Sequence, residues 1–229
     1  MNDHLEFIRS QQLLGMPNIE TSARCPLQCP QCTRAKLQAP KDSNKYKEIK
    51  IRIDNGFDLP LQDAEKLLIF FESGIMLCGQ LSDPVFWPDL FAFLAFSKTY
   101  PNKNIRIMTA ASQRNIEWYK KAFELSHTNV TWAFGLDGMK DISMIYRVGQ
   151  NSTLLFDAMV LGRSLGLKIE WHYIVFEHNL HQIEEAKEFA SKHGIMLNFI
   201  KSNRTGGNVK VPTDWQPEKN KEIITVEDK

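Results

Sequence analysis

The chain has 229 residues, of which 43% are hydrophobic and 24% are charged, and its formal net charge is +1. This composition is typical of one large or two small globular domains. A charge near zero excludes a strong field over the whole molecule, so nonspecific binding to nucleic acid or to anionic membranes is not indicated. Charged residues and prolines break the apolar runs too often for a membrane span, and the acidic N-terminus lacks the apolar core of a secretory signal.

After a polar N-terminal segment (residues 1–16), the run NIETS predicts a short strand over residues 18–22 that leads directly into a cysteine-rich loop. Residues 39–55 are rich in lysine and alternate weakly, which favours an insertion or a hairpin. The apolar spacing of residues 61–72 predicts a helix that Gly74 ends. The short apolar run IMLCG (75–79) then predicts a buried strand.

From there the chain alternates regularly between helices and strands. We expect helices over residues 88–100, 115–125, 153–165 and 180–193, and strands over residues 104–109, 129–136, 168–176 and 195–200. With the two earlier strands this makes six, and strands that alternate with helices form a parallel sheet. Six units are fewer than the eight of a closed barrel. The sequence therefore predicts an α/β fold with an open, curved sheet in a core over residues 17–200.

The C-terminal tail, residues 201–229, is polar and rich in glycine, proline and lysine. Such a composition favours partial disorder. The alternative is a segment that packs under the open edge of the barrel or touches substrate, with Trp215 as its anchor.

Three of the four cysteines, Cys25, Cys29 and Cys32, follow the spacing C-x3-C-x2-C. Clustered cysteines do not form a disulfide framework, and they fit a reducing cytoplasm. A [4Fe–4S] cluster takes four ligands, so three thiolates leave one iron with an open position, where chemistry takes place. The alternative is a zinc site that Cys78 or a histidine closes.

This spacing, placed directly after a strand, resembles the signature of the radical S-adenosylmethionine (radical SAM) enzymes. The resemblance covers residues 19–200 and implies a partial (β/α)6 barrel. It also implies a [4Fe–4S] cluster whose free iron binds SAM. One electron from the reduced cluster then cleaves SAM and releases a 5'-deoxyadenosyl radical, which abstracts a hydrogen atom from the substrate.

The segment after the second strand resembles the Gly-Gly-Glu-Pro motif of this family, whose backbone meets the amino group of SAM. Cys78 and Gly79 stand at the glycine positions, and Asp83 and Pro84 stand at Glu-Pro. Glycine lets a backbone approach a ligand closely, so Cys78 is a departure from the pattern. The alternative is a plain turn between a strand and a helix.

The third and fourth strands end in segments that also match the family in part. Thr109 and Ser112 stand where relatives carry Thr-Asn-Gly, and their hydroxyls would serve the ribose or the carboxylate of SAM, or simply cap a turn. The resemblance places Asp137 beside the ribose and Arg147 against the carboxylate, which a guanidinium binds well. Gly135 replaces the usual serine of this segment.

The resemblance places two further residues near the adenine of SAM: the backbone at Val175, near the end of the fifth strand, and Gln31, where an aromatic residue is common. The alternation of the fifth strand places Glu170, His172 and Ile174 on one face. If this is the barrel lumen, His172 either contacts substrate or is a satisfied core histidine.

The order of the motifs is most similar to the branch with the peptide-modifying maturases and the molybdenum-cofactor enzyme, without a C-terminal cluster domain. We expect a low-potential electron donor such as flavodoxin or ferredoxin and an unidentified substrate, a peptide, protein or nucleotide-like molecule. One alternative is an activase that installs a glycyl radical on a partner enzyme. Another is a non-catalytic zinc or iron–sulfur module, a regulator that uses the lysine-rich segment 41–50.

Overall fold

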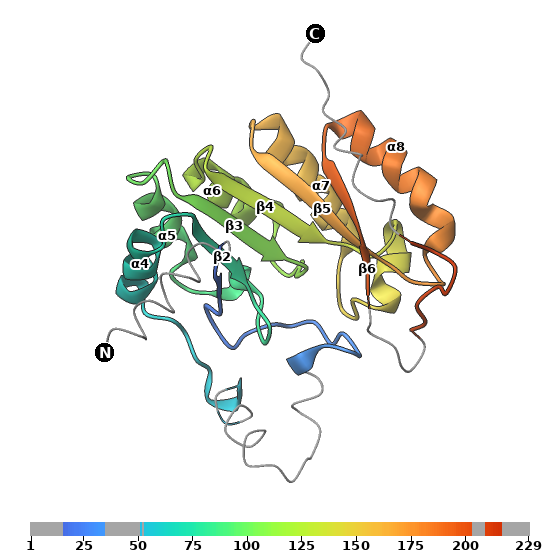
Figure 1. Ribbon diagram of the computed structural model, residues 1–229, viewed down its shortest axis with the longest axis horizontal. Helices are drawn as coiled ribbons and strands as arrows, with labels where there is room; N and C mark the ends of the chain where they lie inside the picture. The colour runs from blue at the N-terminus through green and yellow to red at the C-terminus, as the bar shows by residue number, and fades with distance from the viewer. Residues whose placement is uncertain (1–15, 35–50, 52, 203–208, 217–229) are drawn as a thin grey trace.

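The computed structural model describes residues 16–34, 51, 53–202 and 209–216, and its centre is one sheet of six parallel strands (Figure 1). The strands lie side by side in chain order, from β1 to β6. Their bounds are Asn18–Ile19 (β1), Gly74–Cys78 (β2), Asn104–Thr109 (β3), Val130–Gly135 (β4), Lys168–Val175 (β5) and Met196–Lys201 (β6). The predicted open sheet of six alternating units is confirmed.

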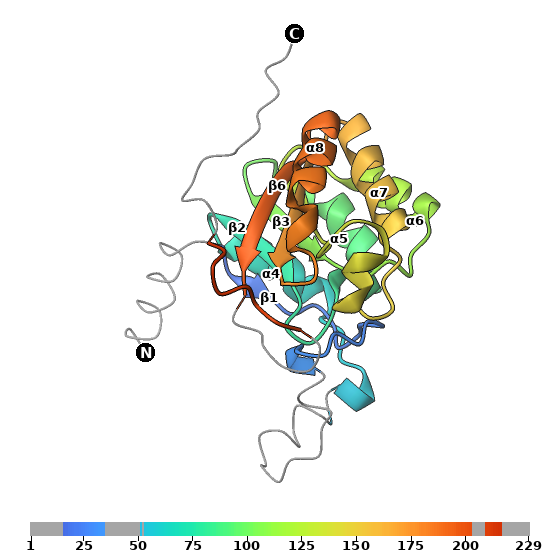
Figure 2. The ribbon, with the colours of Figure 1, turned by 90° about the vertical axis from the view of Figure 1, so that its right-hand side faces the viewer.

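Within the described residues, five helices of eight residues or more lie between successive strands and cover one face of the sheet, as the view in Figure 2 shows. They are α4 (Leu61–Phe70), α5 (Leu90–Ser97), α6 (Ile116–Leu125), α7 (Ser152–Ser164) and α8 (Ile183–His193), with short 3-10 turns η1 (Pro84–Phe86), η2 (Lys140–Ile145) and η3 (Leu180–Gln182). Gly194 ends α8 in the left-handed conformation, with φ 63°, as a glycine after a helix commonly does. No helix within the described residues is long and apolar enough to cross a membrane.

The face of the sheet toward the helices, here called the outer face, holds the core. Trp132, Trp171 and Tyr173 on this face are fully buried. Trp132 contacts the Tyr119 ring of α6, and Trp171 contacts the Phe189 ring of α8. Large aromatic side chains dominate the burial of apolar surface, so this layer supplies much of the stability of the fold.

The opposite face, here called the inner face, carries alternate residues of the same strands. The register places Arg106 on this face beside Met76 and Thr131, and it places His172 beside Gly135. The inner face is less completely covered, since Arg106, Gly135 and His172 all remain partly accessible. The predicted common face of Glu170, His172 and Ile174 is therefore the inner face.

Two segments differ from the sequence-based expectation. The weak alternation before residue 55 favoured a hairpin as one reading, but residues 53–55 are helical. In the C-terminal tail, residues 209–216 are ordered against the sheet: Val209 is buried, Glu177 N–H donates to Lys210 O (2.9 Å), and the Trp215 ring lies 6.4 Å from that of Phe199. Here the alternative with Trp215 as an anchor is correct. The N-terminal residues 1–15, the lysine-rich segment 41–50 and residues 217–229 lie outside the described residues, and the division into segments 1–16, 17–200 and 201–229 stays a prediction.

Candidate functional site

The cysteine loop (residues 24–32) lies below the carboxyl ends of the strands in Figure 1 and connects two sides of the sheet. Asp83 N–H, in the segment after β2, donates to Arg24 O (2.8 Å), and Gln28 N–H donates to Val148 O (3.0 Å), in the segment after β4. The carboxyl ends of parallel strands are where ligands of such folds bind. The loop therefore lies at the edge of the sheet that favours a site.

None of the four cysteines forms a disulfide, and Cys25, Cys29 and Cys32 lie in mutual electrostatic contact. Burial raises the pKa of Cys25 to about 12, with further contributions from Asp83 and the other two thiols. Burial also raises the pKa of Cys29, although the Arg147 guanidinium acts in the opposite direction. The thiols of Cys25 and Cys29, whose pKa is raised, become good ligands only beside a positive centre that lowers their pKa again.

Three thiols are the donor type that an iron–sulfur cluster takes. A zinc ion also accepts thiolates. A [4Fe–4S] cluster held by Cys25, Cys29 and Cys32 would leave one iron without a protein ligand, and Cys78 would not be required to complete the set.

The turn after β2 depends on a glycine and on a glutamate that the sequence analysis missed. A Cβ on Gly79 would lie 2.0 Å from Ser82 O, so only glycine fits here. The Glu20 carboxylate accepts hydrogen bonds from Gln80 N–H (2.7 Å) and Leu81 N–H (3.0 Å). Cys78 N–H donates to Asn18 Oδ1 (3.2 Å). Asn18 in β1 and Glu20 just after it therefore hold the turn that is predicted to meet the amino group of SAM.

Asp83 is fixed by the protein itself. Its buried carboxylate accepts hydrogen bonds from Ala110 N–H (2.8 Å), Ala111 N–H (3.0 Å) and Val85 N–H (3.2 Å). Burial raises its pKa, although these hydrogen bonds act in the opposite direction. Asp83 thus links the segment after β2 to the segment that follows β3.

Of the other predicted residues, Thr109 and Ser112 are buried and bonded within the fold. Thr109 follows Ile105 and Ile107 in alternation, and its side chain lies on the outer face, where it is hydrogen-bonded to Tyr119. Ser112 Oγ accepts from Asn151 N–H at the start of α7. The structure therefore does not bring these two hydroxyls to the inner face.

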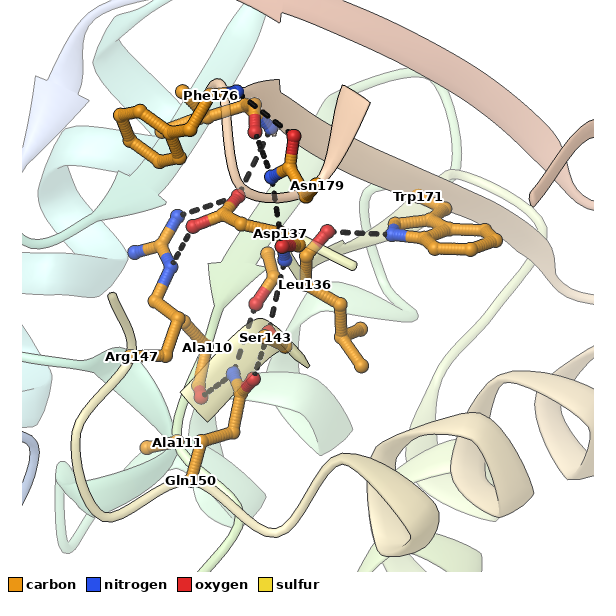
Figure 3. Close-up of polar contacts among 12 residues, drawn as sticks. Ala110, Ala111, Leu136, Asp137, Ser143, Arg147, Gln150, Trp171, Phe176 and Asn179 are labelled. Carbon is orange, nitrogen blue, oxygen red and sulfur yellow. Dashed lines mark hydrogen bonds and ion pairs between the residues drawn. The ribbon is translucent and has the colours of Figure 1, made fainter. Parts of the chain in front are cut away.

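Asp137 and Arg147 form a buried ion pair at the end of β4 (Figure 3). Arg147 Nε donates to Asp137 Oδ2 (2.7 Å), and Ile174 N–H donates to Asp137 Oδ1 (2.9 Å). Burial opposes the charge of Arg147, but Asp137 and the nearby Cys29 raise its pKa above the usual value. The structure thus brings Asp137, Arg147 and Cys29 together, and the Arg147 guanidinium is already paired with the Asp137 carboxylate, a contact that the sequence analysis did not predict.

Gly135 explains how the guanidinium fits. A Cβ at this position would lie 3.2 Å from Arg147 Nη2 and 3.3 Å from Ala110 Cβ. The absence of a side chain therefore makes room for Arg147, where the family pattern has a serine hydroxyl.

Two buried amides that the sequence analysis did not place in the site complete the network in Figure 3. Asn179 Nδ2 donates to Asp137 O (2.8 Å) and Ile174 O (2.9 Å). Gln150 Nε2 donates to Ala110 O (2.6 Å) and Gly135 O (2.9 Å). They join the ends of β3, β4 and β5. Their only signal in the sequence is a position shortly after or between predicted elements.

Two predicted residues remain, Gln31 and Val175. Gln31 is half-buried in the turn between Cys29 and Cys32, and Val175 is buried at the carboxyl end of β5. Their contacts with adenine stay a prediction.

No family model and no curated protein matches the chain, but solved structures share its fold. SuiB of Streptococcus suis bound to S-adenosylmethionine aligns with a TM-score of 0.64 and 17% identity, over 87% of this chain and 43% of that one. The enzyme anSMEcpe with bound AdoMet aligns with a TM-score of 0.57 and 15% identity, over 82% and 49%. Methylornithine synthase (PylB) aligns with a TM-score of 0.50 and 14% identity, over 83% and 56%. The chain thus spans about half the length of these proteins, and its fold is that of the radical SAM enzymes, as the resemblance predicts.

Proposed function

We propose that the chain is a radical SAM enzyme. Cys25, Cys29 and Cys32 would hold a [4Fe–4S] cluster, with SAM at the remaining iron. When bound and reduced by one electron, such a cluster would supply the chemistry that cleaves SAM to methionine and a 5'-deoxyadenosyl radical. The observation that carries the proposal is the position of three free, mutually close thiols beside the carboxyl ends of six parallel strands.

The surrounding residues would bind and orient SAM. The turn at Cys78 and Gly79, held by Glu20, would offer its backbone to the amino group. Arg147 is charged and keeps N–H groups beyond those that bind Asp137, so it would attract the SAM carboxylate. Asp83, Thr109 and Ser112 would act by positioning these segments rather than by touching SAM.

For adenine we retain the predicted contacts with Gln31 and with the backbone at Val175. The buried aromatic pair Tyr146 and Phe176, with ring centroids 4.9 Å apart, lies next to Arg147 and supports an apolar wall on this side of the site.

The substrate would enter from the inner face, and a low-potential flavodoxin or ferredoxin would supply the electron. Two of the structural neighbours were solved with peptides: SuiB with its precursor peptide SuiA, and anSMEcpe with the Cp18Cys peptide. The peptides bound to these neighbours support a peptide or protein substrate over a nucleotide-like one for this chain.

Anaerobic reconstitution tests the proposal. The unaltered protein should bind about four irons and four sulfides and release 5'-deoxyadenosine from SAM in the presence of dithionite. Cys32→Ala should abolish SAM cleavage, whereas the matched control Cys78→Ala should retain the cluster. One zinc ion per chain without acid-labile sulfide, or full SAM cleavage by Cys32→Ala, would contradict the assignment.

A further inference from the structure

The segment that follows η2 packs against the cysteine loop (residues 24–32). Gln28 N–H donates to Val148 O (3.0 Å). On the next residue, a Cβ built on Gly149 would lie 3.9 Å from Leu27 Cδ2, an ordinary van der Waals distance. The residues on either side of these contacts are therefore held next to each other, and they include one of the three clustered cysteines and a buried arginine.

That arginine, Arg147, contacts the thiol of Cys29. Its guanidinium donates a hydrogen bond to Cys29, and both this bond and its charge lower the pKa of the thiol. Cys29 is 7% exposed, and the side chain of Arg147 is 15% exposed. A charge acts more strongly in such a buried place than at the surface, because little water screens it. Arg147 thus acts directly on one of the proposed ligands of the iron–sulfur cluster.

Asp137 opposes part of this effect. Its fully buried carboxylate pairs with Arg147 Nε (2.7 Å) and also accepts from Ile174 N–H (2.9 Å), so the ion pair is held in one orientation (Figure 3). The guanidinium nevertheless lowers the pKa of Cys29 more than the carboxylate raises it. The pair, although neutral as a whole, therefore presents its positive end to the sulfur of Cys29.

The three thiols are consequently not equivalent. Cys25 faces the carboxyl group of Asp83, which raises the pKa of that thiol further, whereas Cys29 faces a guanidinium. A hydrogen bond to a ligating sulfur and a nearby positive charge both favour the more negative, reduced form of an iron–sulfur cluster. The side of the site at Cys29 thus favours uptake of an electron.

We propose that Arg147 is a positioning residue that acts through Cys29 to raise the reduction potential of the iron–sulfur cluster, and that Asp137 limits this rise. The inference rests on the proposed function for the presence of the cluster. It is compatible with the proposed contact between Arg147 and the SAM carboxylate, because a guanidinium has five N–H groups and Asp137 takes at most two of them.

A redox titration of the anaerobically reconstituted protein, followed by electron paramagnetic resonance without SAM, tests the proposal. Dithionite supplies the one electron that the oxidised cluster takes up. Arg147→Gln should lower the equilibrium constant of this reduction about tenfold, which is a fall in potential of about 59 mV. Arg147→Lys keeps the charge but not the planar fork, so its potential should lie between the two.

Asp137→Asn should move the potential in the opposite direction, because it removes the opposing charge and keeps an oxygen that can still accept from Ile174 N–H. The matched control Lys168→Gln removes a positive charge from the exposed first residue of β5, at the end of the strand away from the site. Its potential should equal that of the unaltered protein.

Circular dichroism and the iron and sulfide content establish that each variant is folded and loaded. Since the two charge changes predict opposite shifts, either one suffices if the other variant does not load. A potential that neither Arg147→Gln nor Asp137→Asn changes, or a shift opposite to the expected one, would overturn the proposal. Failure of the unaltered protein to bind iron and sulfide would instead contradict the proposed function, and the metal content reports this before any titration.

Discussion

The two faces of the sheet use the same strands for different purposes. On the outer face, side chains such as Trp132 and Trp171 are fully buried against helices. On the inner face, Arg106 and His172 are polar, partly exposed and not fully hydrogen-bonded. Stability therefore resides mainly in the outer layer, which leaves the inner face free to carry groups that suit a ligand rather than the fold.

The largest expected difference between the two faces comes from removing one large side chain from each. Trp171→Ala should lower the free energy of unfolding by about 3–5 kcal/mol, because it leaves a cavity and also removes the hydrogen bond from Nε1 to Leu136 O (2.8 Å). Met76→Ala, at a half-buried position of the inner face, should cost about 1 kcal/mol. Urea unfolding measures both, and equal losses would contradict the division.

A second pair of variants compares two asparagines. Asn179→Ala should cost roughly 2–4 kcal/mol, because it leaves Asp137 O, Ile174 O and Phe176 N–H without their partner. Asn198→Ala, on the inner face, should cost less than about 1 kcal/mol, since its contact with Glu170 Oε2 is long at 3.5 Å. The melting temperatures of both variants measure these losses. A larger loss for Asn198→Ala than for Asn179→Ala would contradict the expected difference between the two faces.

The smallest effect is the pH dependence of the Glu170 carboxylate, which contacts Arg106 and His172. The pKa of Glu170 is lower in the folded protein than its ordinary value of 4.5, so its ionisation stabilises the fold at neutral pH. This contribution is lost as the pH falls below 4.5 and through the folded pKa. The melting temperature of Glu170→Gln should therefore fall less steeply over this acidic range than that of the unaltered protein. Parallel curves for the two proteins would show that Glu170 does not contribute. The buried Asp83, whose pKa is raised, acts in the opposite direction in both proteins.

Much of the fold could be predicted because each strand is a short apolar run between turn residues. The strand Asn104–Thr109 was predicted with its full bounds. The helix predicted to end at residue 193 does so, because Gly194 adopts the left-handed conformation that glycine readily takes. The alternation in NIRIMT also predicts that the Thr109 side chain lies on the same face of the sheet as Ile105 and Ile107, which is the outer face. The resemblance outweighed that signal, and the hydroxyl was assigned to the cofactor.

What the sequence could not reveal are partners distant in the chain. Glu20 binds backbone N–H groups about 60 residues away, and Gln150 joins strand ends that precede it by 40 and 15 residues. Nothing local to these residues distinguishes them from surface side chains, because their role depends on tertiary packing. The helical turn at residues 53–55 was obscured for a related reason, since weak alternation over so few residues does not separate a helix from a strand.

The close approach of Gly135 to Arg147 makes these two positions interdependent in any redesign of the protein. A hydroxymethyl group at position 135 would place its Cβ 3.2 Å from Arg147 Nη2, so the guanidinium would have to move by a few tenths of an ångström. A segment exchanged at position 135 would therefore also need a compatible position for the Arg147 guanidinium. Because the two residues are in contact, the effects of single substitutions at positions 135 and 147 would not add up to the effect of the double substitution.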